Sequence, residues 1–173
     1  CVISSNSDAY GLKRAEKAGI ATAVIDHQLF DSRFKADKEI MKVIDDSRAV
    51  VIILAGYLRI LSPEFIEKYL GKILNIHPSL LPKFKGLNTH QRAIDAAEKI
   101  HGASVHFVTE ELDGGPIIAQ SSVEIDSTDN AKSLASKVLN IEHVLYPKTI
   151  RWYTQGRIKL IGDNSVQLDG QII

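Results

Sequence analysis

Apolar residues recur along the chain with the spacing of short strands and amphipathic helices, and the two kinds of element alternate through the first hundred residues. The pattern predicts strands at residues 1–4, 22–25, 50–55, 73–76, 103–108 and 116–125. It predicts helices at residues 9–18, 31–46, 62–70, 90–99 and 130–154, and a small hairpin at 157–161 and 166–168. Such alternation is typical of an α/β fold. We therefore predict a single α/β domain over residues 1–173, with a mixed, mainly parallel twisted sheet and helices on both faces.

Local signals mark several of these boundaries. Gly19 follows the first helix as a C-cap glycine. The continuously apolar run Val50–Ala55 suits a parallel strand that helices cover on both faces. Ser62-Pro63-Glu64 combines a hydroxyl N-cap, an early proline and an acid at the positive end of the helix dipole. Pro147 is expected to break or kink the last helix.

Composition narrows the classes of partner. The 21 Lys and Arg residues balance 21 Asp and Glu residues, so no net charge attracts nucleic acid or an anionic membrane. The longest apolar stretch, Ala49–Leu58, is far shorter than the roughly 20 residues of a membrane span. A single cysteine, Cys1, excludes an intramolecular disulfide framework and fits a reducing compartment. We expect a cytoplasmic protein without nucleic-acid or membrane partners, either a monomer or a homodimer.

The segment ILNIHPSLLP, residues 73–82, stands out from this background. Polar Asn75 and His77 lie two positions apart, on one face of the chain, where a buried strand is predicted to end. Pro78 and Pro82 stiffen the backbone that leaves this strand. In open α/β sheets, ligands bind beyond the carboxyl ends of the strands. The position of Asn75 and His77 therefore favours a ligand site.

Each polar residue also has a purely structural interpretation. Asn75 fits a turn, and His77 fits a hydrogen-bonded structural histidine. Asp113 precedes two glycines between two predicted strands, which is first of all a turn signal, although it could be both turn residue and reactive group. His106 alternates with Val105 and Phe107, so it is interpreted as facing the less buried side of its strand.

In combination, an amide, an imidazole and a carboxylate suffice to move an acyl group between amines. The amide and the protonated imidazole donate hydrogen bonds to the oxygen that becomes negative in the tetrahedral intermediate. The carboxylate, directly or through water, relays the proton that the attacking amine loses. No Gly-x-Ser-x-Gly elbow is present, and the 6 histidines show no His-x-x-x-His pair. We therefore predict neither a serine nucleophile nor a metal site.

These residues carry a family resemblance. ILNIHPSLLP, followed after a short helix by HGASVHFVTEELDGGPIIAQ, closely resembles the folate-dependent formyltransferases. The segments LAGYLRILSPEFI, FKGLNTHQRAI and EHVLYP are similar to the branch of the family that acts on glycinamide ribonucleotide. The resemblance implies a Rossmann-like formyltransferase fold. It also implies transfer of the formyl group of 10-formyltetrahydrofolate to the amine of glycinamide ribonucleotide, a step of de novo purine (IMP) biosynthesis.

The resemblance also implies roles for individual residues. The catalytic set would be Asn75, His77 and Asp113. The folate would be bound by Arg33 near the entrance, by the pterin-pocket residues Leu58, Arg59, Ile60 and Leu61, and by the closing loop of Val108, Thr109, Glu110, Glu111 and Leu112. The ribonucleotide would be bound by Lys83, Gly86, Asn88 and Glu142. Without the resemblance, Arg59 fits a solvated charge at a strand end and Glu142 a surface charge on a helix.

The beginning of the chain departs from the family pattern. The family has a further strand, a Gly-Asn-Gly-Ser-Asn loop and a helix ahead of the strand that matches residues 1–4. That loop binds the ribonucleotide phosphate through backbone amides at a helix N-terminus. The chain starts at Cys1 without a methionine, and no other Gly-rich loop opens a helix. We therefore expect residues 1–173 to be an N-terminally incomplete formyltransferase catalytic domain.

Several rival functions remain open at this point. Within the superfamily, the rivals are a 10-formyltetrahydrofolate hydrolase and a formyltransferase that acts on an amino sugar or an aminoacyl-tRNA. The tRNA enzyme normally carries an additional carboxyl-terminal domain. A dinucleotide-binding module would need a Gly-x-Gly-x-x-Gly turn, which the sequence lacks. A non-catalytic folate-binding domain is the remaining alternative.

Overall fold

The computed structural model describes residues 1–162 and 164–173. The chain forms two compact units. The first unit consists of residues 1–50 and 59–68, and the second of residues 51–58 and 69–173. Each unit has its own secondary structure and is described separately.

The first unit combines a short parallel sheet with helices. Strand β1 (Val2–Ser4) pairs in parallel with β2 (Thr22–Val24), and α1 (Tyr10–Lys17) connects the two. Leu12 and Ala15 of α1 are buried. The 3-10 turn η1 (His27–Leu29), α2 (Arg33–Asp46) and α3 (Pro63–Lys68) complete the unit. The strands and helices predicted for residues 1–46 are thus confirmed, with boundaries shifted by at most two residues.

Side-chain oxygens fix the helix starts of this unit. The hydroxyl of Ser32 accepts a hydrogen bond from the Lys35 amide and caps α2. The buried carboxylate of Asp37 accepts from the Ser62 amide at 2.7 Å, immediately before α3. The hydroxyl of Ser62 in turn accepts from the Phe65 amide. The helix start predicted at Ser62 is therefore confirmed.

The second unit is built on a mixed four-stranded sheet. Its strands lie in the order β3 (Ile52–Leu54), β4 (Ile73–His77), β5 (Ile100–Phe107) and β6 (Ile117–Glu124). Strands β3 and β4 are parallel, whereas the β4–β5 and β5–β6 pairs are antiparallel. The parallel pairs of both units thus lie in the first 77 residues, where the alternation of strands and helices predicted them.

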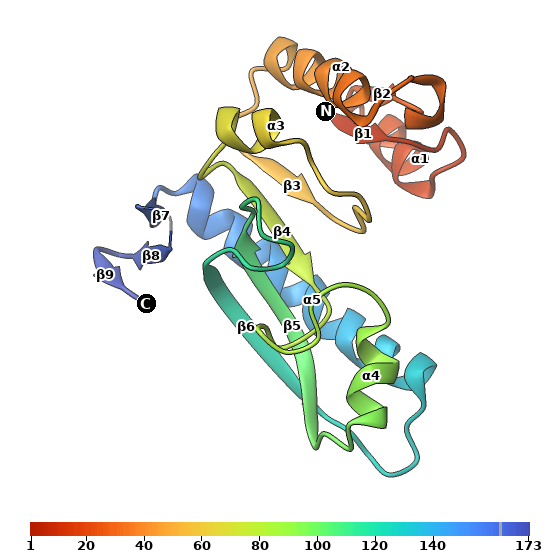
Figure 1. Cartoon of the computed structure of the whole chain (residues 1–173), viewed down its shortest axis with the longest axis vertical. Coiled ribbons are helices and arrows are strands. Elements are labelled where there is room, and N and C mark those ends of the chain that lie inside the picture. Colours follow the sequence, from red (N-terminus) through yellow and green to blue (C-terminus); the bar gives the residue numbers. More distant parts are fainter. Residues whose placement is uncertain (163) are drawn as a thin grey trace. The chain divides into compact units, whose positions relative to one another are not determined.

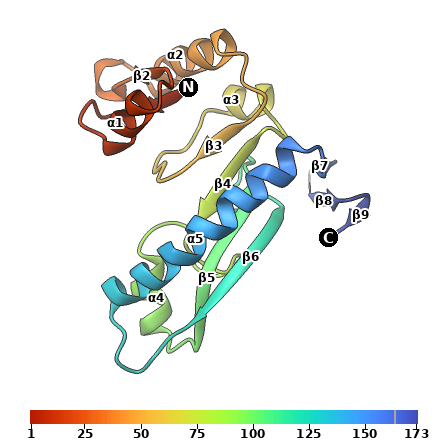
Figure 2. The same cartoon turned by 180° about the vertical axis from the view of Figure 1, so that it is seen from behind.

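Helix α5 (Ala131–Thr154) covers one face of this sheet, behind it in Figure 1 and in front of it in Figure 2. Leu134 and Val138 of α5 pack with Leu74, Val105 and Phe107 of the strands in the buried core. The helix runs through Pro147, so the expected break is absent. Pro147 removes one backbone donor, but buried residues on both sides of it keep the helix on the sheet: Leu145, Tyr146 and Thr149.

Two boundaries differ from the prediction by more than two residues: the end of α4, and the start of β5 at Ile100 in place of residue 103. Helix α4 (Thr89–Asp95) ends four residues before the predicted end at 99, because Ala97 takes a positive φ of 51° and the chain then enters β5 at Ile100. The predicted carboxyl-terminal hairpin is present as β7 (Ile158–Ile161) and β8 (Ser165–Leu168). A third strand, β9 (Gln171–Ile172), extends it.

Tyr146 joins α5 to the two parallel strands. Its hydroxyl lies 2.8 Å from the Leu54 carbonyl oxygen and 2.9 Å from the Leu74 carbonyl oxygen, and burial raises the pKa of this phenol. We predict that Tyr146→Phe lowers the free energy of unfolding by about 1–3 kcal/mol, because a buried donor is lost. Tyr10→Phe, at a residue 74% exposed, serves as the control and is expected to change it by less than about 0.5 kcal/mol. Equal denaturant midpoints for the two variants would contradict this assignment.

Candidate functional site

The alternation of β4 divides its side chains between two faces of the sheet. Leu74 and Ile76 belong to the core beneath α5, so Asn75 and His77 lie on the opposite face. The antiparallel register with β5 places Asn75 opposite His106, and His77 opposite Ser104. Four polar residues of two adjacent strands therefore share one face at the end of β4.

His106 is buried, with 2% of its surface exposed, so the prediction that it faces a less buried side is wrong. Its Nδ1–H donates to the Phe107 carbonyl oxygen at 2.8 Å. Its Nε2 lies 3.1 Å from Asn75 Nδ2 and accepts a hydrogen bond from that amide. Burial lowers the pKa of His106, and the Phe107 hydrogen bond and Asp113 only partly oppose this effect. The neutral ring with a proton on Nδ1 fits these contacts.

His77 and Asp113 form a second pair on this face. The Nδ1 atom of His77 lies 3.4 Å from Asp113 Oδ2, and both side chains are at least nine-tenths buried. The Nε2–H of His77 donates to the Phe84 carbonyl oxygen at 2.9 Å. Both ring nitrogens thus face oxygen acceptors, an arrangement that the doubly protonated ring satisfies.

Asp113 is both a turn residue and a member of the site. Its backbone takes a positive φ of 47° after β5, in the turn that the Asp-Gly pair predicted. Its Oδ2 accepts a hydrogen bond from the Gly86 amide at 2.9 Å, and its Oδ1 lies 3.8 Å from His106 Nε2. The turn therefore brings the carboxylate to both histidines.

A hydrogen-bond network fixes the segment that leaves β4. The Ser104 hydroxyl donates to the Ser79 carbonyl oxygen at 2.6 Å and accepts from the Leu81 amide at 3.0 Å. The Gln120 amide donates to the Leu81 carbonyl oxygen and to Ser104 Oγ. The Leu81–Pro82 peptide bond is cis. The rigidity that the prolines predicted is thus supplemented by side chains from β5 and β6.

Two predicted ligand segments meet beside Asp113. Lys85 lies between Lys83 and Gly86, which are expected to bind the ribonucleotide, and forms a 2.6 Å ion pair with Glu111 of the loop expected to close over the folate. Arg92 of α4 donates to the Lys85 carbonyl oxygen at 2.6 Å and so holds the first segment. Lys83 instead pairs with Glu98 at 2.7 Å. Asn88 takes a left-handed conformation at the start of α4.

The hydrogen bonds and ion pairs described above do not link the other predicted site residues to Asn75, His77 or Asp113. Glu142 lies on α5, where burial raises the pKa of its carboxyl group. Arg33, Arg59, Ile60 and Leu61 belong to the first unit, whereas Leu58 belongs to the second. Leu58 and Ile60 are exposed and Leu61 is buried. Their roles in ligand binding stay predictions.

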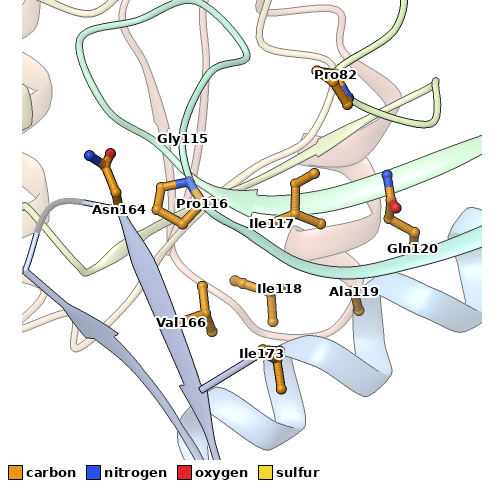
Figure 3. Close-up of a pocket in the computed structure, with 10 residues that line it drawn as sticks. All are labelled: Pro82, Gly115, Pro116, Ile117, Ile118, Ala119, Gln120, Asn164, Val166 and Ile173. Carbon is orange, nitrogen blue, oxygen red and sulfur yellow. The ribbon is translucent and has the colours of Figure 1, made fainter.

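A separate groove lies beside β6. Its volume is about 600 Å³, and mainly apolar residues of the β6 region and the carboxyl-terminal strands line it (Figure 3). Its lining contains Gly115 and Pro116, but none of Asn75, His77 and Asp113. Among the described residues, no group of three or more His, Cys, Asp or Glu is placed to hold a metal ion. No helix in the described part of the chain is long and apolar enough to cross a membrane.

Gly114 and Gly115 provide a test of the turn geometry. A Cβ atom on Gly115 would lie 1.9 Å from the Phe107 carbonyl oxygen, which is backbone and cannot turn away. A Cβ on Gly114 would instead meet the exposed, flexible side chain of Glu111, at 2.2 Å from its Cδ. We predict that Gly115→Ala lowers the free energy of unfolding by about 2 kcal/mol or more, and Gly114→Ala by less than about 1 kcal/mol. Denaturant unfolding measures both, and a smaller loss for Gly115→Ala than for Gly114→Ala would contradict the geometry.

Proteins of known sequence and structure are similar to this chain over nearly its whole length. The phosphoribosylglycinamide formyltransferase of Escherichia coli (strain K12) is 48% identical over 170 residues, which are 98% of this chain and 80% of that protein. The structure of the phosphoribosylglycinamide formyltransferase of Coxiella burnetii superposes with a TM-score of 0.94 at 45% identity, covering 99% of this chain and 81% of that chain. A formyltetrahydrofolate deformylase from Pseudomonas syringae pv. tomato is less similar, at 30% identity and a TM-score of 0.87, and the match covers 97% of this chain and 55% of that chain.

These relatives confirm the resemblance and the α/β fold predicted from the sequence, and they are named as transferases at the higher identities. Residues 1–150 match the family described as formyl transferase. The chain belongs to the formyl transferase family.

Proposed function

We propose that the protein transfers the formyl group of 10-formyltetrahydrofolate to the primary amine of glycinamide ribonucleotide, a step of purine biosynthesis. The observation that carries this proposal is that Asn75 and His77 share the polar face of β4, where the turn after β5 brings Asp113 to 3.4 Å from His77. The names of the relatives at 45% and 48% identity support the same reaction.

The reaction needs a new bond between the amine nitrogen and the formyl carbon. As that bond forms, the carbonyl electrons move to the formyl oxygen and give a tetrahedral intermediate. Hydrogen bonds from Asn75 Nδ2–H and from the His77 ring stabilise this negative oxygen. The intermediate collapses when the bond between the formyl carbon and N10 of the folate breaks, and N10 takes up the proton that the amine loses.

Asp113 is suited to carry that proton. Its Oδ2 already interacts with the Gly86 amide and with His77 Nδ1. Within the described residues, its Oδ1 accepts no hydrogen bond, which leaves this atom to accept a proton from the amine, directly or through water. The carboxylate therefore has two roles in this proposal: it orients the imidazole through one oxygen and moves the proton through the other.

The donor of His77 must change its partner during the reaction. In the structure its Nε2–H donates to the Phe84 carbonyl oxygen. The formyl oxygen would replace this carbonyl oxygen as the acceptor when the substrates bind. Phe84 has a positive φ of 57°, in the segment assigned to the ribonucleotide, so substrate binding and release of this donor involve the same stretch of backbone.

The ligand contacts of the proposal follow the family resemblance. Arg33, Leu58, Arg59, Ile60, Leu61 and residues 108–112 bind the folate, and Lys83, Gly86, Asn88 and Glu142 bind the ribonucleotide. The contact of Gly86 with Asp113 and the pairing of Lys85 with Glu111 support adjacent ligand segments. In this proposal residues 1–173 belong to one catalytic domain, which acts in the cytoplasm as a monomer or homodimer and needs no metal.

Hydrolysis of the same cofactor is the nearest alternative, because the catalytic set would serve water as well as an amine. The relative named as a deformylase has 30% identity, against 48% for the transferase of Escherichia coli, which favours transfer. A product assay separates the two reactions: transfer yields formylated ribonucleotide, whereas hydrolysis yields formate whether or not the ribonucleotide is present.

We predict that His77→Ala and Asp113→Asn, made in the intact protein, each lower kcat for formyl transfer by about a hundred- to a thousand-fold. Folate affinity is expected to change little, because the groups act on the intermediate rather than on the bound cofactor. The double variant is expected to lose less than the product of the single losses, because the two side chains act as a unit.

The exposed residue Asp46 provides a matched control, since Asp46→Asn removes the same charge on α2 and should leave kcat within about twofold. Turnover is followed from the folate absorbance and from the mass of the formylated ribonucleotide. Retention of more than about a tenth of normal kcat by either site variant would refute the assignment of that residue.

A further inference from the structure

We propose that His106 is a positioning residue: by accepting a hydrogen bond from Asn75, it fixes which end of the Asn75 amide faces the formyl oxygen. This inference rests on the proposed function, because it concerns the donor that Asn75 supplies. The sequence pattern assigned His106 no role in the site, although it is the last polar residue of β5, after His101 and Ser104.

The strand register is the first support for this role. Asn75 and His106 are directly paired residues of β4 and β5, so their side chains stand next to each other on the same face. On its other side, β5 pairs with β6 through an irregularity at Val105 and His106, where Ile118 is the extra residue of β6. Such bulges redirect side chains next to functional sites. The pairing thus brings the ring to the amide.

The tautomer of His106 is the second support. A carbonyl oxygen can only accept, so the 2.8 Å contact with the Phe107 oxygen requires the proton on Nδ1. The neutral ring then carries a lone pair on Nε2, 3.1 Å from Asn75 Nδ2. Because the ring is 2% exposed, water does not compete for this lone pair. The backbone of β5 therefore determines that the ring presents an acceptor to Asn75.

Charged groups around the ring shift the pKa of His106 in both directions. Asp113 raises the pKa of His106, whereas His77 and Lys85 lower it. Burial is the largest effect and lowers it, so the acceptor form persists near neutral pH.

The consequence concerns the polarity of the Asn75 amide. The oxygen and nitrogen ends of a carboxamide have nearly the same shape, so packing alone does not distinguish them. With Nδ2 toward His106, one N–H is used by the ring and the second remains for the formyl oxygen. A flipped amide would place the Oδ1 acceptor against the Nε2 lone pair of His106. The orientation that leaves an N–H for the formyl oxygen would then be lost. His106 thus selects the donating orientation.

Two substitutions separate this role from simple packing. His106→Asn keeps an amide donor near the position of Nδ1, within reach of the Phe107 oxygen, but loses the acceptor toward Asn75. His106→Gln extends an amide to the position of Nε2, where its oxygen can accept from Asn75. We expect His106→Asn to lower kcat about a hundred-fold with little change in KM, comparable to the loss of one oxyanion donor. The kcat of His106→Gln should be at least about tenfold higher than that of His106→Asn, when the two variants have the same thermal stability.

The Asn75→Ala background provides the decisive comparison. If His106 acts through Asn75, His106→Asn should lower the residual rate of Asn75→Ala by less than about twofold. An equal fold-loss in both backgrounds would overturn the inference, as would kcat for His106→Asn above about a third of normal. Equal losses for the Asn and Gln variants would also overturn it. If Asn75→Ala itself turned over normally, the catalytic assignment of Asn75 would fail and the inference with it, an outcome distinct from a failure of His106 alone.

Discussion

The antiparallel pairing of β4 with β5 is the constraint on which the site depends. It divides each strand between an apolar face that packs beneath α5 and a polar face that carries Asn75, His77 and His106. A shift of the register by one residue would exchange these faces, which would place the histidines in the core and expose Leu74 and Val105. The apolar contacts that stabilise the second unit therefore also maintain the β4–β5 register and keep Asn75, His77 and His106 on the polar face.

The loops then complete what the strands begin. The turn after β5 delivers Asp113 to His77, and the segment after β4 delivers the Gly86 amide to the same carboxylate. Lys85 and Glu111 join the two segments outside this contact. The segments predicted to bind the two ligands thus meet beside Asp113. The formyl transferase reaction, which needs both substrates at once, suits such a shared anchor.

Local sequence patterns predicted the parts of this arrangement that local chemistry determines. The end of β4, the start of α3 at Ser62 and the turn at Asp113 all arise from side-chain alternation, capping and turn preference. The burial of His106 could not be predicted in this way, because alternation identifies the face of a strand but not what covers it. The cover includes Asp113, seven positions later in the chain. Similarly, the preference of Pro147 for a helix end is outweighed by tertiary packing that only the fold reveals. The predicted folate-binding residues are divided between the two units, so their assignment rests on family resemblance.

The hydrogen-bond chain from the Phe107 oxygen through His106 to Asn75 is the central claim, and its proton positions can be measured directly. Nitrogen-15 NMR of the intact protein, with labelled histidine and asparagine at neutral pH, reports the protonation of each ring nitrogen. The structure predicts a protonated Nδ1 and an unprotonated Nε2 for His106, with a coupling from the Asn75 amide nitrogen to Nε2 across the hydrogen bond. A proton on Nε2, or rapid exchange between the two tautomers, would contradict the account.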